Sequence, residues 1–197
     1  LFHYSKTIHT IEKNNRNGYN CERGFSSYIE CRKESAVQNI LFEKYSVERI
    51  VYESDDATVY LVEHIFMQTR RIIKKILKKS IHHNSFYSET NILKTIKHPN
   101  IPIIYDQYED ECAFYIVEEY IEAQNLFDYI RDNGVLSESL AIDIGIKLCE
   151  IISFLHSQKP TPILFLDIQP KNILIKKEKI YLVDFGNSYF VDEANNR

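Results

Sequence analysis

The sequence has few cysteines, and none of them is placed as a cysteine-based site would require. Among 197 residues there are four, Cys21, Cys31, Cys112 and Cys149, and no two form a C-x-x-C pair. Such wide spacing indicates neither a zinc site nor a disulfide framework. Isolated cysteines are typical of a reducing compartment, so we expect a cytoplasmic protein.

Long apolar runs and an excess of basic charge are also absent. No apolar stretch approaches the roughly 20 residues that a helix needs to cross a bilayer, and the first residues lack the basic-then-apolar order of a signal peptide. The formal net charge is -4, from 24 Lys and Arg against 28 Asp and Glu. We therefore expect no membrane span in this chain and no nucleic-acid partner, because nucleic-acid binding requires a basic field.

Hydrophobic residues, by contrast, make up 44% of the chain, which is enough to bury a core in one domain or in two small lobes. Residues 1–34 are polar and irregular, and no function can be assigned to them. Apolar side chains at helical spacing in residues 35–45, among them Val37, Ile40 and Leu41, predict a short packing helix.

The next part of the chain alternates between strand and helix patterns. Five segments predict the strands of an antiparallel sheet: 47–50, 58–64, 69–77, 101–108 and 113–117. Three segments predict helices: 85–97, 125–130 and a long one that Ser137 caps and that reaches His156.

Three oxygen-bearing side chains are expected to converge near the end of the chain. Asp167 and Asn172 flank Pro170, which stiffens their loop, and a hairpin from Ile173 to Val183 then returns Asp184 to the same place. Hard oxygen ligands of this kind suit a Mg²⁺ ion that stays partly hydrated and is completed by nucleotide phosphates. The third side chain could instead orient a hydroxyl group.

These residues resemble the catalytic loop and the metal-binding Asp-Phe-Gly of the eukaryotic-like protein kinases, here Phe165-Leu-Asp-Ile-Gln-Pro-Lys-Asn172 and Asp184-Phe185-Gly186. Arg71-Ile-Ile-Lys74 resembles the Val-Ala-Ile-Lys of the family's third strand, and Glu89 lies on the helix that follows. The resemblance covers roughly residues 45–191, and its specificity comes from the order and spacing of the motifs.

The resemblance implies an α+β, protein-kinase-like two-lobed fold. It would combine an antiparallel five-stranded small lobe with a truncated, mainly helical large lobe. Residues 1–44 would be an N-terminal extension, residues 45–121 the small lobe and hinge, and residues 122–197 the start of the large lobe with the catalytic loop.

The resemblance also implies a function, Mg-ATP-dependent phosphotransfer to a hydroxyl, most plausibly Ser or Thr of a protein. Lys74, held by Glu89, would position the α and β phosphates, and Asp167 would accept or orient the hydroxyl. ATP and Mg²⁺ would be the cofactors, with Asn172 and Asp184 holding the metal. The adenine site would comprise Val59, Ile72 and Leu174 together with backbone groups near Glu119 and Ile121.

Several positions depart from the family pattern. Tyr52, Ser54 and Ala57 replace the glycines of the phosphate-cradling turn. Glu118 stands at the gatekeeper position beside the adenine site, where an apolar side chain is usual. A carboxylate there must be solvated, paired or shifted in pKa, because an unpaired buried charge is costly.

The catalytic loop departs from the pattern as well. Phe165 and Leu166 replace the His-Arg before the catalytic Asp, so regulation through an activation-loop phosphate is not expected. Phe165 can still stack in an apolar column with Phe185 and Leu93. Gln169 replaces a lysine that neutralises the transferring phosphate, and Lys171 is a candidate substitute.

These departures leave two other functions open: a pseudokinase that acts as a binding or scaffolding module, and a small-molecule kinase. A protein substrate or partner protein is expected under the leading hypothesis. Because the sequence starts at Leu1 and ends soon after the Asp-Phe-Gly, we expect a piece of a longer protein. The family's later helices would be missing, which predicts exposed apolar surface and a homo-oligomer.

Overall fold

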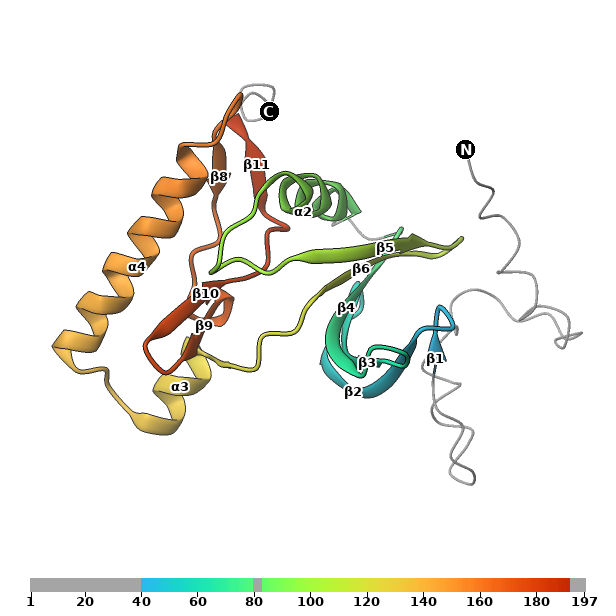
Figure 1. Cartoon of the computed structure of the whole chain (residues 1–197), viewed down its shortest axis with the longest axis horizontal. Helices are drawn as coiled ribbons and strands as arrows, with labels where there is room; N and C mark the ends of the chain where they lie inside the picture. The colour runs from blue at the N-terminus through green and yellow to red at the C-terminus, as the bar shows by residue number, and fades with distance from the viewer. Residues whose placement is uncertain (1–39, 80–82, 192–197) are drawn as a thin grey trace, which may run out of the picture. The chain divides into compact units, whose positions relative to one another are not determined.

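A six-stranded antiparallel sheet forms the first part of the fold (Figure 1), in a computed structural model that describes residues 40–79 and 83–191. The strand order is β1-β2-β3-β4-β6-β5. The strands are β1 Ile40–Leu41, β2 Tyr45–Glu53, β3 Ala57–His64, β4 Thr69–Leu77, β5 Ile104–Glu109 and β6 Ala113–Glu119. All five predicted strands are present, and β1 is added at the edge. The α+β class is thus confirmed, while the predicted domain boundaries stay predictions.

Alternation along the strands gives this sheet two different faces. Tyr60 of β3 pairs with Ile73 of β4, which pairs in turn with Val117 of β6, and all three side chains are buried on one face. Because successive side chains point to opposite faces of a sheet, Lys74 lies on the other. Its partner on β3 is Val59. We call the face that carries Val59 and Lys74 the cleft face.

The predicted helix over residues 35–45 is wrong for its described part. Ile40 and Leu41 form β1, which pairs with the start of β2. Phe42 and Glu43 both have positive φ, 53° and 58°, and the Lys44 N–H donates to the Leu41 carbonyl at 3.1 Å. This left-handed turn reverses the chain before a helix can form. Residues 35–39 lie outside the described part of the chain.

In the described part of the chain, three helices occur in the expected order. They are α2 His83–Thr95, α3 Leu126–Asn133 and α4 Glu138–His156. Ser137 caps α4 as predicted, because its Oγ accepts a hydrogen bond from the Leu140 N–H at 3.3 Å. Gly134 ends α3 with a φ of 83°, a conformation that a residue with a Cβ rarely adopts.

Short strands bring the loop that carries Asp167 and Asn172 together with the hairpin that follows it. These elements are β7 Gln124–Asn125, β8 Ile163–Phe165, the 3₁₀ turn η4 Pro170–Asn172, β9 Ile173–Lys176, β10 Lys179–Leu182 and β11 Ser188–Phe190. The predicted hairpin is β9-β10, with Ile175 opposite Ile180 and Lys177 at positive φ in its turn. β11 pairs with β8, so the chain beyond Gly186 returns to the start of the loop.

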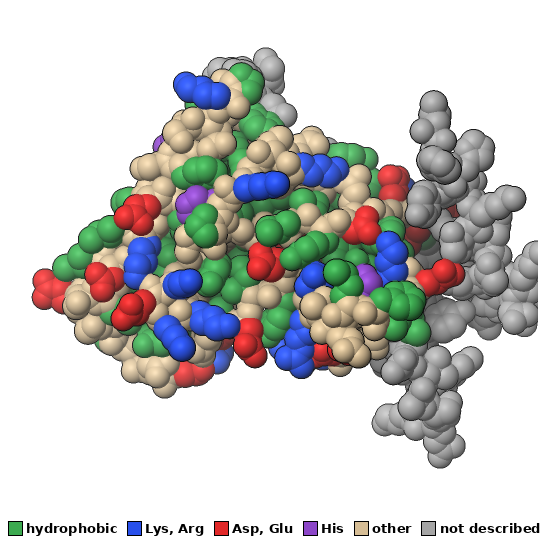
Figure 2. Space-filling model, in the orientation of Figure 1, with side chains coloured by type: hydrophobic (Ala, Val, Ile, Leu, Met, Phe, Trp, Pro, Cys, Tyr) green, Lys and Arg blue, Asp and Glu red, His purple; other side chains and the backbone are tan. Residues whose placement is uncertain are grey.

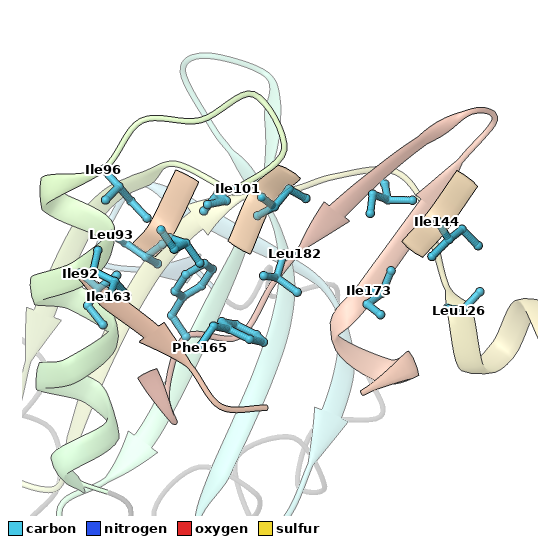
Figure 3. Packing of buried hydrophobic residues seen from close by; sticks show 14 of the residues in the cluster. Ile92, Leu93, Ile96, Ile101, Leu126, Ile144, Ile163, Phe165, Ile173 and Leu182 are labelled. Carbon is cyan, nitrogen blue, oxygen red and sulfur yellow. The ribbon is translucent and has the colours of Figure 1, made fainter. Parts of the chain in front are cut away.

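One hydrophobic cluster connects α2 and α4 with strands β8, β9 and β10 (Figure 3). It contains the predicted column: Leu93, Phe165 and Phe185 are buried together, and the two phenylalanine rings meet edge to face at 5.0 Å. The Leu182 N–H donates to the Asn100 carbonyl at 2.9 Å, which ties the hairpin to the segment after α2. The elements that carry the candidate site therefore share a core.

The structure also bears on the expectations drawn from composition. No helix among the described residues is long and apolar enough to span a bilayer. Figure 2 shows acidic and basic side chains interspersed on the face in view. One expectation fails: Cys112 is disulfide-bonded, whereas Cys149 is a free, exposed thiol.

Two isoleucines of α4 test the core assignment. Ile151 is 1% exposed and Ile146 is 54% exposed, so replacing each with alanine removes the same atoms from opposite environments. We expect Ile151→Ala to lower the free energy of unfolding by about 2–5 kcal/mol, because it leaves a cavity. Ile146→Ala should change it by less than about 0.5 kcal/mol. Urea unfolding measures both, and equal losses would contradict the assignment.

Candidate active site

The Lys74 ammonium group lies among three carboxylates from three different elements. Its Nζ is 2.5 Å from Glu89 Oε1 on α2, 3.4 Å from Glu118 Oε2 on β6 and 4.0 Å from Asp184 Oδ1 after β10. Glu89 and Glu118 are buried, at 2% and 3% exposure, while the Asp184 side chain is 53% exposed. The site therefore has a buried ion cluster with one side open to solvent.

Burial and charge act in opposite directions on these groups. Burial alone would lower the pKa of Lys74, but Glu118, Glu89 and Asp184 more than offset it and raise the pKa. Lys74 therefore stays a cation at neutral pH. Burial raises the pKa of Glu118; Lys74 opposes this shift, and Glu89 and Asp184 add to it. The pairing and the pKa shift expected for a gatekeeper carboxylate are thus both present.

Glu89 joins Lys74 of β4 to the Asp-Phe-Gly segment. The Oε1 atom that contacts Lys74 also accepts a hydrogen bond from the Phe185 backbone N–H at 3.0 Å. One residue earlier on α2, the Ser88 hydroxyl donates to the Ser188 carbonyl. Two neighbouring residues of α2 therefore fix the segment that follows Asp184.

The Asp167 carboxylate is held by neutral amides from three directions. The Gln169 side-chain amide donates to both of its oxygens, at 2.9 and 3.0 Å. The amides of Asn172 and Asn187 donate to Oδ2 at 3.0 and 3.3 Å. No Lys or Arg among the described residues forms an ion pair with Asp167, and the Lys171 Nζ lies over the Phe127 ring, 5.3 Å from its centroid.

Asn172 and Asp184 come together as the hairpin closes. The Val183 N–H donates to the Asn172 carbonyl at 3.0 Å, which places Asp184 beside η4, and Asp184 itself has a φ of 67°. The Asn172 amide nitrogen bonds the carbonyl and carboxylate of Asp167, which leaves the amide oxygen for another partner.

This donor set fits Mg²⁺. It supplies one carboxylate and one amide oxygen, both hard ligands, and the described residues contain no group of three or more His, Cys, Asp or Glu that could hold a metal without help. A Mg²⁺ ion that keeps waters and takes phosphate oxygens needs few protein ligands.

The predicted adenine-site residues lie on separate elements. Val59 and Ile72 are half-buried on the cleft face, and Leu174 is half-buried on β9 of another sheet. The Glu119 N–H already donates to the Ile103 carbonyl at 2.8 Å, so a ligand there would have to use the Glu119 carbonyl. Ile121 follows β6 and is half-buried. Their roles stay predictions.

Comparison with known proteins decides the family. The family model described as "Protein kinase domain" matches residues 45–197. The chain belongs to the protein kinase domain family. It is 34% identical to the serine/threonine-protein kinase PrkC of Bacillus subtilis over 73% of this chain and 22% of that protein. It is 31% identical to the serine/threonine-protein kinase SIK1 of Mus musculus over 74% of this chain and 19% of that protein.

The kinase domain here spans about a fifth of the length of these curated relatives, at 22% and 19%.

Two side-chain contacts of the candidate site were not predicted from the sequence. The Asn187 amide donates a hydrogen bond to Asp167, and the one feature of the sequence that could have indicated this contact is the position of Asn187 directly after Gly186. Glu118 was expected to need a partner, and the sequence did not identify that partner as Lys74.

The buried Glu118 carboxyl of this kinase domain predicts a pH dependence of stability. Its pKa is raised above the ordinary 4.5, so the folded protein binds more protons than the unfolded chain once the pH exceeds that value. Stability is therefore lost as pH rises. We expect Glu118→Gln to become more stable relative to wild type between about pH 5 and 8.

Urea unfolding across this range measures the difference. Glu63→Gln is the matched control, since it makes the same change at an exposed position of β3. A difference between Glu118→Gln and wild type that stays constant with pH would contradict the raised pKa.

Proposed function

We propose that this kinase domain transfers the γ-phosphate of ATP, with Mg²⁺, to a serine or threonine hydroxyl of a protein. The observation that carries the proposal is the chain of contacts from Lys74 through Glu89 to the Phe185 N–H. It brings the cation of the small lobe next to Asp184, whose neighbour Val183 is bonded to the catalytic loop.

Each of these residues has a defined task in the proposed reaction. The Lys74 ammonium binds phosphate oxygens while Glu89 fixes its position. The Asp167 carboxylate, oriented by Gln169 and Asn172, accepts a hydrogen bond from the substrate hydroxyl and aligns it for attack. Asn172 and Asp184 would hold Mg²⁺, which when bound neutralises charge on the phosphates.

The relatives named as serine/threonine-protein kinases support a protein hydroxyl as the acceptor. A small-molecule acceptor remains the further alternative, since the same arrangement of Asp167 and Asn172 would align any hydroxyl. The cytoplasmic location and the homo-oligomer also stay predictions. Exposed apolar side chains, such as Ile142 and Val135 at 54% and 97% exposure, are the surface on which that expectation rests.

A pseudokinase is favoured by one specific observation. The β2-β3 turn contains no glycine: the Ser54 Oγ accepts a hydrogen bond from the Ala57 N–H at 3.1 Å, and Asp55 and Asp56 lie between them. Side chains and two negative charges therefore occupy a turn where backbone N–H groups would otherwise approach phosphates. This feature weakens nucleotide binding and leaves Asp167 and Lys74 in place.

Nucleotide binding is accordingly expected to be weak and to depend on Mg²⁺. The oxygen ligands are present, whereas the turn contributes repulsion in place of a cradle. Calorimetric titration with ATP, with and without Mg²⁺, measures this. Tight binding that ignores the metal would contradict the assignment of Asn172 and Asp184 as ligands.

The proposed roles of two aspartates predict different losses. Asp167→Asn should leave Mg-ATP affinity nearly unchanged while phosphotransfer falls by about 10²-fold or more, the scale of a positioned acid or base. Asp184→Asn should weaken Mg-ATP binding as well. Radiolabelled transfer to a generic protein or to the chain itself, paired with binding measurements, checks both variants.

Asp143→Asn, an exposed change on α4, is the matched control and should behave as wild type. Wild-type transfer no greater than that of Asp167→Asn would overturn the enzyme proposal. Unaltered nucleotide binding would then leave a pseudokinase as the better account.

A further inference from the structure

The residues just before β2 pack on the face of the six-stranded sheet that lies opposite the cleft face. Leu41 is buried there, in the same hydrophobic cluster as Tyr60, Ile73 and Val117. The matched family model begins with the first residue of β2, so these preceding residues lie outside the part of the chain that matches the family. We call residues 41–44 the strap.

The Phe42 side chain of the strap is seated against two tyrosines. Its ring stacks on the Tyr108 ring of β5, with centroids 3.9 Å apart and planes 8° from parallel. It also meets the Tyr115 ring of β6 edge to face, at 5.0 Å. Contacts between aromatic rings contribute free energy beyond the burial of their area. The strap is therefore attached to two neighbouring strands through one side chain.

Lys44 adds polar contacts to the same strand. Its Nζ donates to the Tyr108 hydroxyl at 3.1 Å and lies 3.4 Å from Asp106 Oδ2. The Tyr108 hydroxyl in turn donates to Asp106 at 2.6 Å. An exposed ion pair alone contributes little, but here it joins a network that includes the tyrosine on which Phe42 stacks. β5 thus receives both the ring and the cation of the strap.

The backbone of the strap is strained between these two contacts. Phe42 and Glu43 both have positive φ, 53° and 58°, and neither is a glycine. Such backbone angles cost free energy and persist where the surroundings over-determine them. Phe42 and Lys44 are fixed on β5, and the Lys44 carbonyl also accepts a hydrogen bond from the Ile65 N–H at 2.8 Å. These contacts offset the strain of the turn.

β5 lies between the strap and α2. Successive side chains of a strand point to opposite faces, so Asp106 and Tyr108 face the strap and Gln107 faces the other way. On that side Lys94, in the last turn of α2, donates to the Gln107 side-chain oxygen at 2.6 Å. β5 is an edge strand, and among the described strands it pairs with β6 alone. Its position therefore depends on what packs against its two faces.

We propose that the strap is a positioning device, which docks on the outer face of the sheet and, by holding β5, supports the last turn of α2. The same helix carries Glu89, which bonds the Phe185 N–H in the candidate site. The docking surface fits an aromatic ring followed two residues later by a cation, and the chain's own Phe42 and Lys44 fill it. This inference concerns packing and does not rest on the proposed phosphotransfer.

Amide hydrogen exchange of the whole chain, resolved by mass spectrometry, tests the proposal. Phe42→Ala and Phe66→Ala remove the same atoms, and Phe66 is the control because it is 80% exposed in the turn after β3. We expect Phe42→Ala to speed exchange of the amides in residues 104–109 and 92–95 by about tenfold or more, since the ring contacts that oppose local opening are lost. Phe66→Ala should change these rates by less than about twofold.

The pattern along the chain separates a local effect from a general loss of stability. A general loss speeds exchange of all the slowest amides alike, as we expect for Ile151→Ala in the core of α4. The proposal is overturned if Phe42→Ala affects residues 104–109 no more than it affects the hairpin at 173–182. It is also overturned if residues 104–109 respond while residues 92–95 do not, because the strap would then leave α2 unsupported.

Milder changes keep the test available if Phe42→Ala does not fold. Phe42→Leu keeps an apolar side chain without the stacked ring, and Lys44→Met keeps the length of the side chain without its charge. Each should speed exchange in the same two segments by about threefold. Lys179→Met, at an exposed position of β10, is the matched control for the lysine. Unchanged rates in both strap variants would overturn the proposal, and none of these rates depends on whether the chain transfers phosphate.

Discussion

The candidate site depends on keeping one positive charge buried among negative ones. Burial alone would lower the pKa of Lys74, and the neighbouring acidic groups more than offset this; Lys74 in turn opposes the rise that burial gives to the pKa of Glu118. Each group therefore lowers the free-energy cost of burying the others. The hydrophobic cluster and the sheet supply the enclosure, and the ion cluster determines how β4, β6 and α2 must be placed within it.

The two halves of the site use different chemistry for the same purpose of fixing a side chain. Around Lys74 the contacts are between full charges, which are strong where water is excluded. Around Asp167 the donors are amides of Gln169, Asn172 and Asn187, so the carboxylate is oriented without a cation. Under the proposed function, this neutral setting would leave the Asp167 carboxylate able to accept a hydrogen bond from a substrate hydroxyl.

Sequence reasoning was most successful where local chemistry determines local structure. The Ser137 cap, the β9-β10 hairpin and the strands with period-two alternation follow from rules that act within a few residues. The helix expected over Ile40 and Leu41 was wrong because helical spacing over so few residues does not exclude a strand, and the reversal at Phe42 and Glu43 needs backbone angles that composition does not reveal.

The relations within the site were harder to predict, since they join distant segments. The pairing of Lys74 with Glu89 could be expected from a family resemblance, but the reach of Asn187 to Asp167 could not, because an asparagine after a glycine suggests only a loop. For the same reason the sequence indicated that Glu118 needed a partner without identifying Lys74.

The contacts between α2 and the segment after Asp184 affect the order in which the protein folds. The bond from the Phe185 N–H to Glu89 spans 96 positions, and the one from Ser88 to Ser188 spans 100. Closing loops of that length is entropically costly and slow compared with forming a helix or hairpin. During synthesis on the ribosome the N-terminal part of the chain is made first. The contacts of α2 with Phe185 and Ser188 therefore cannot form until those residues have left the ribosome. The sheet that carries Lys74 can therefore be complete before the site is.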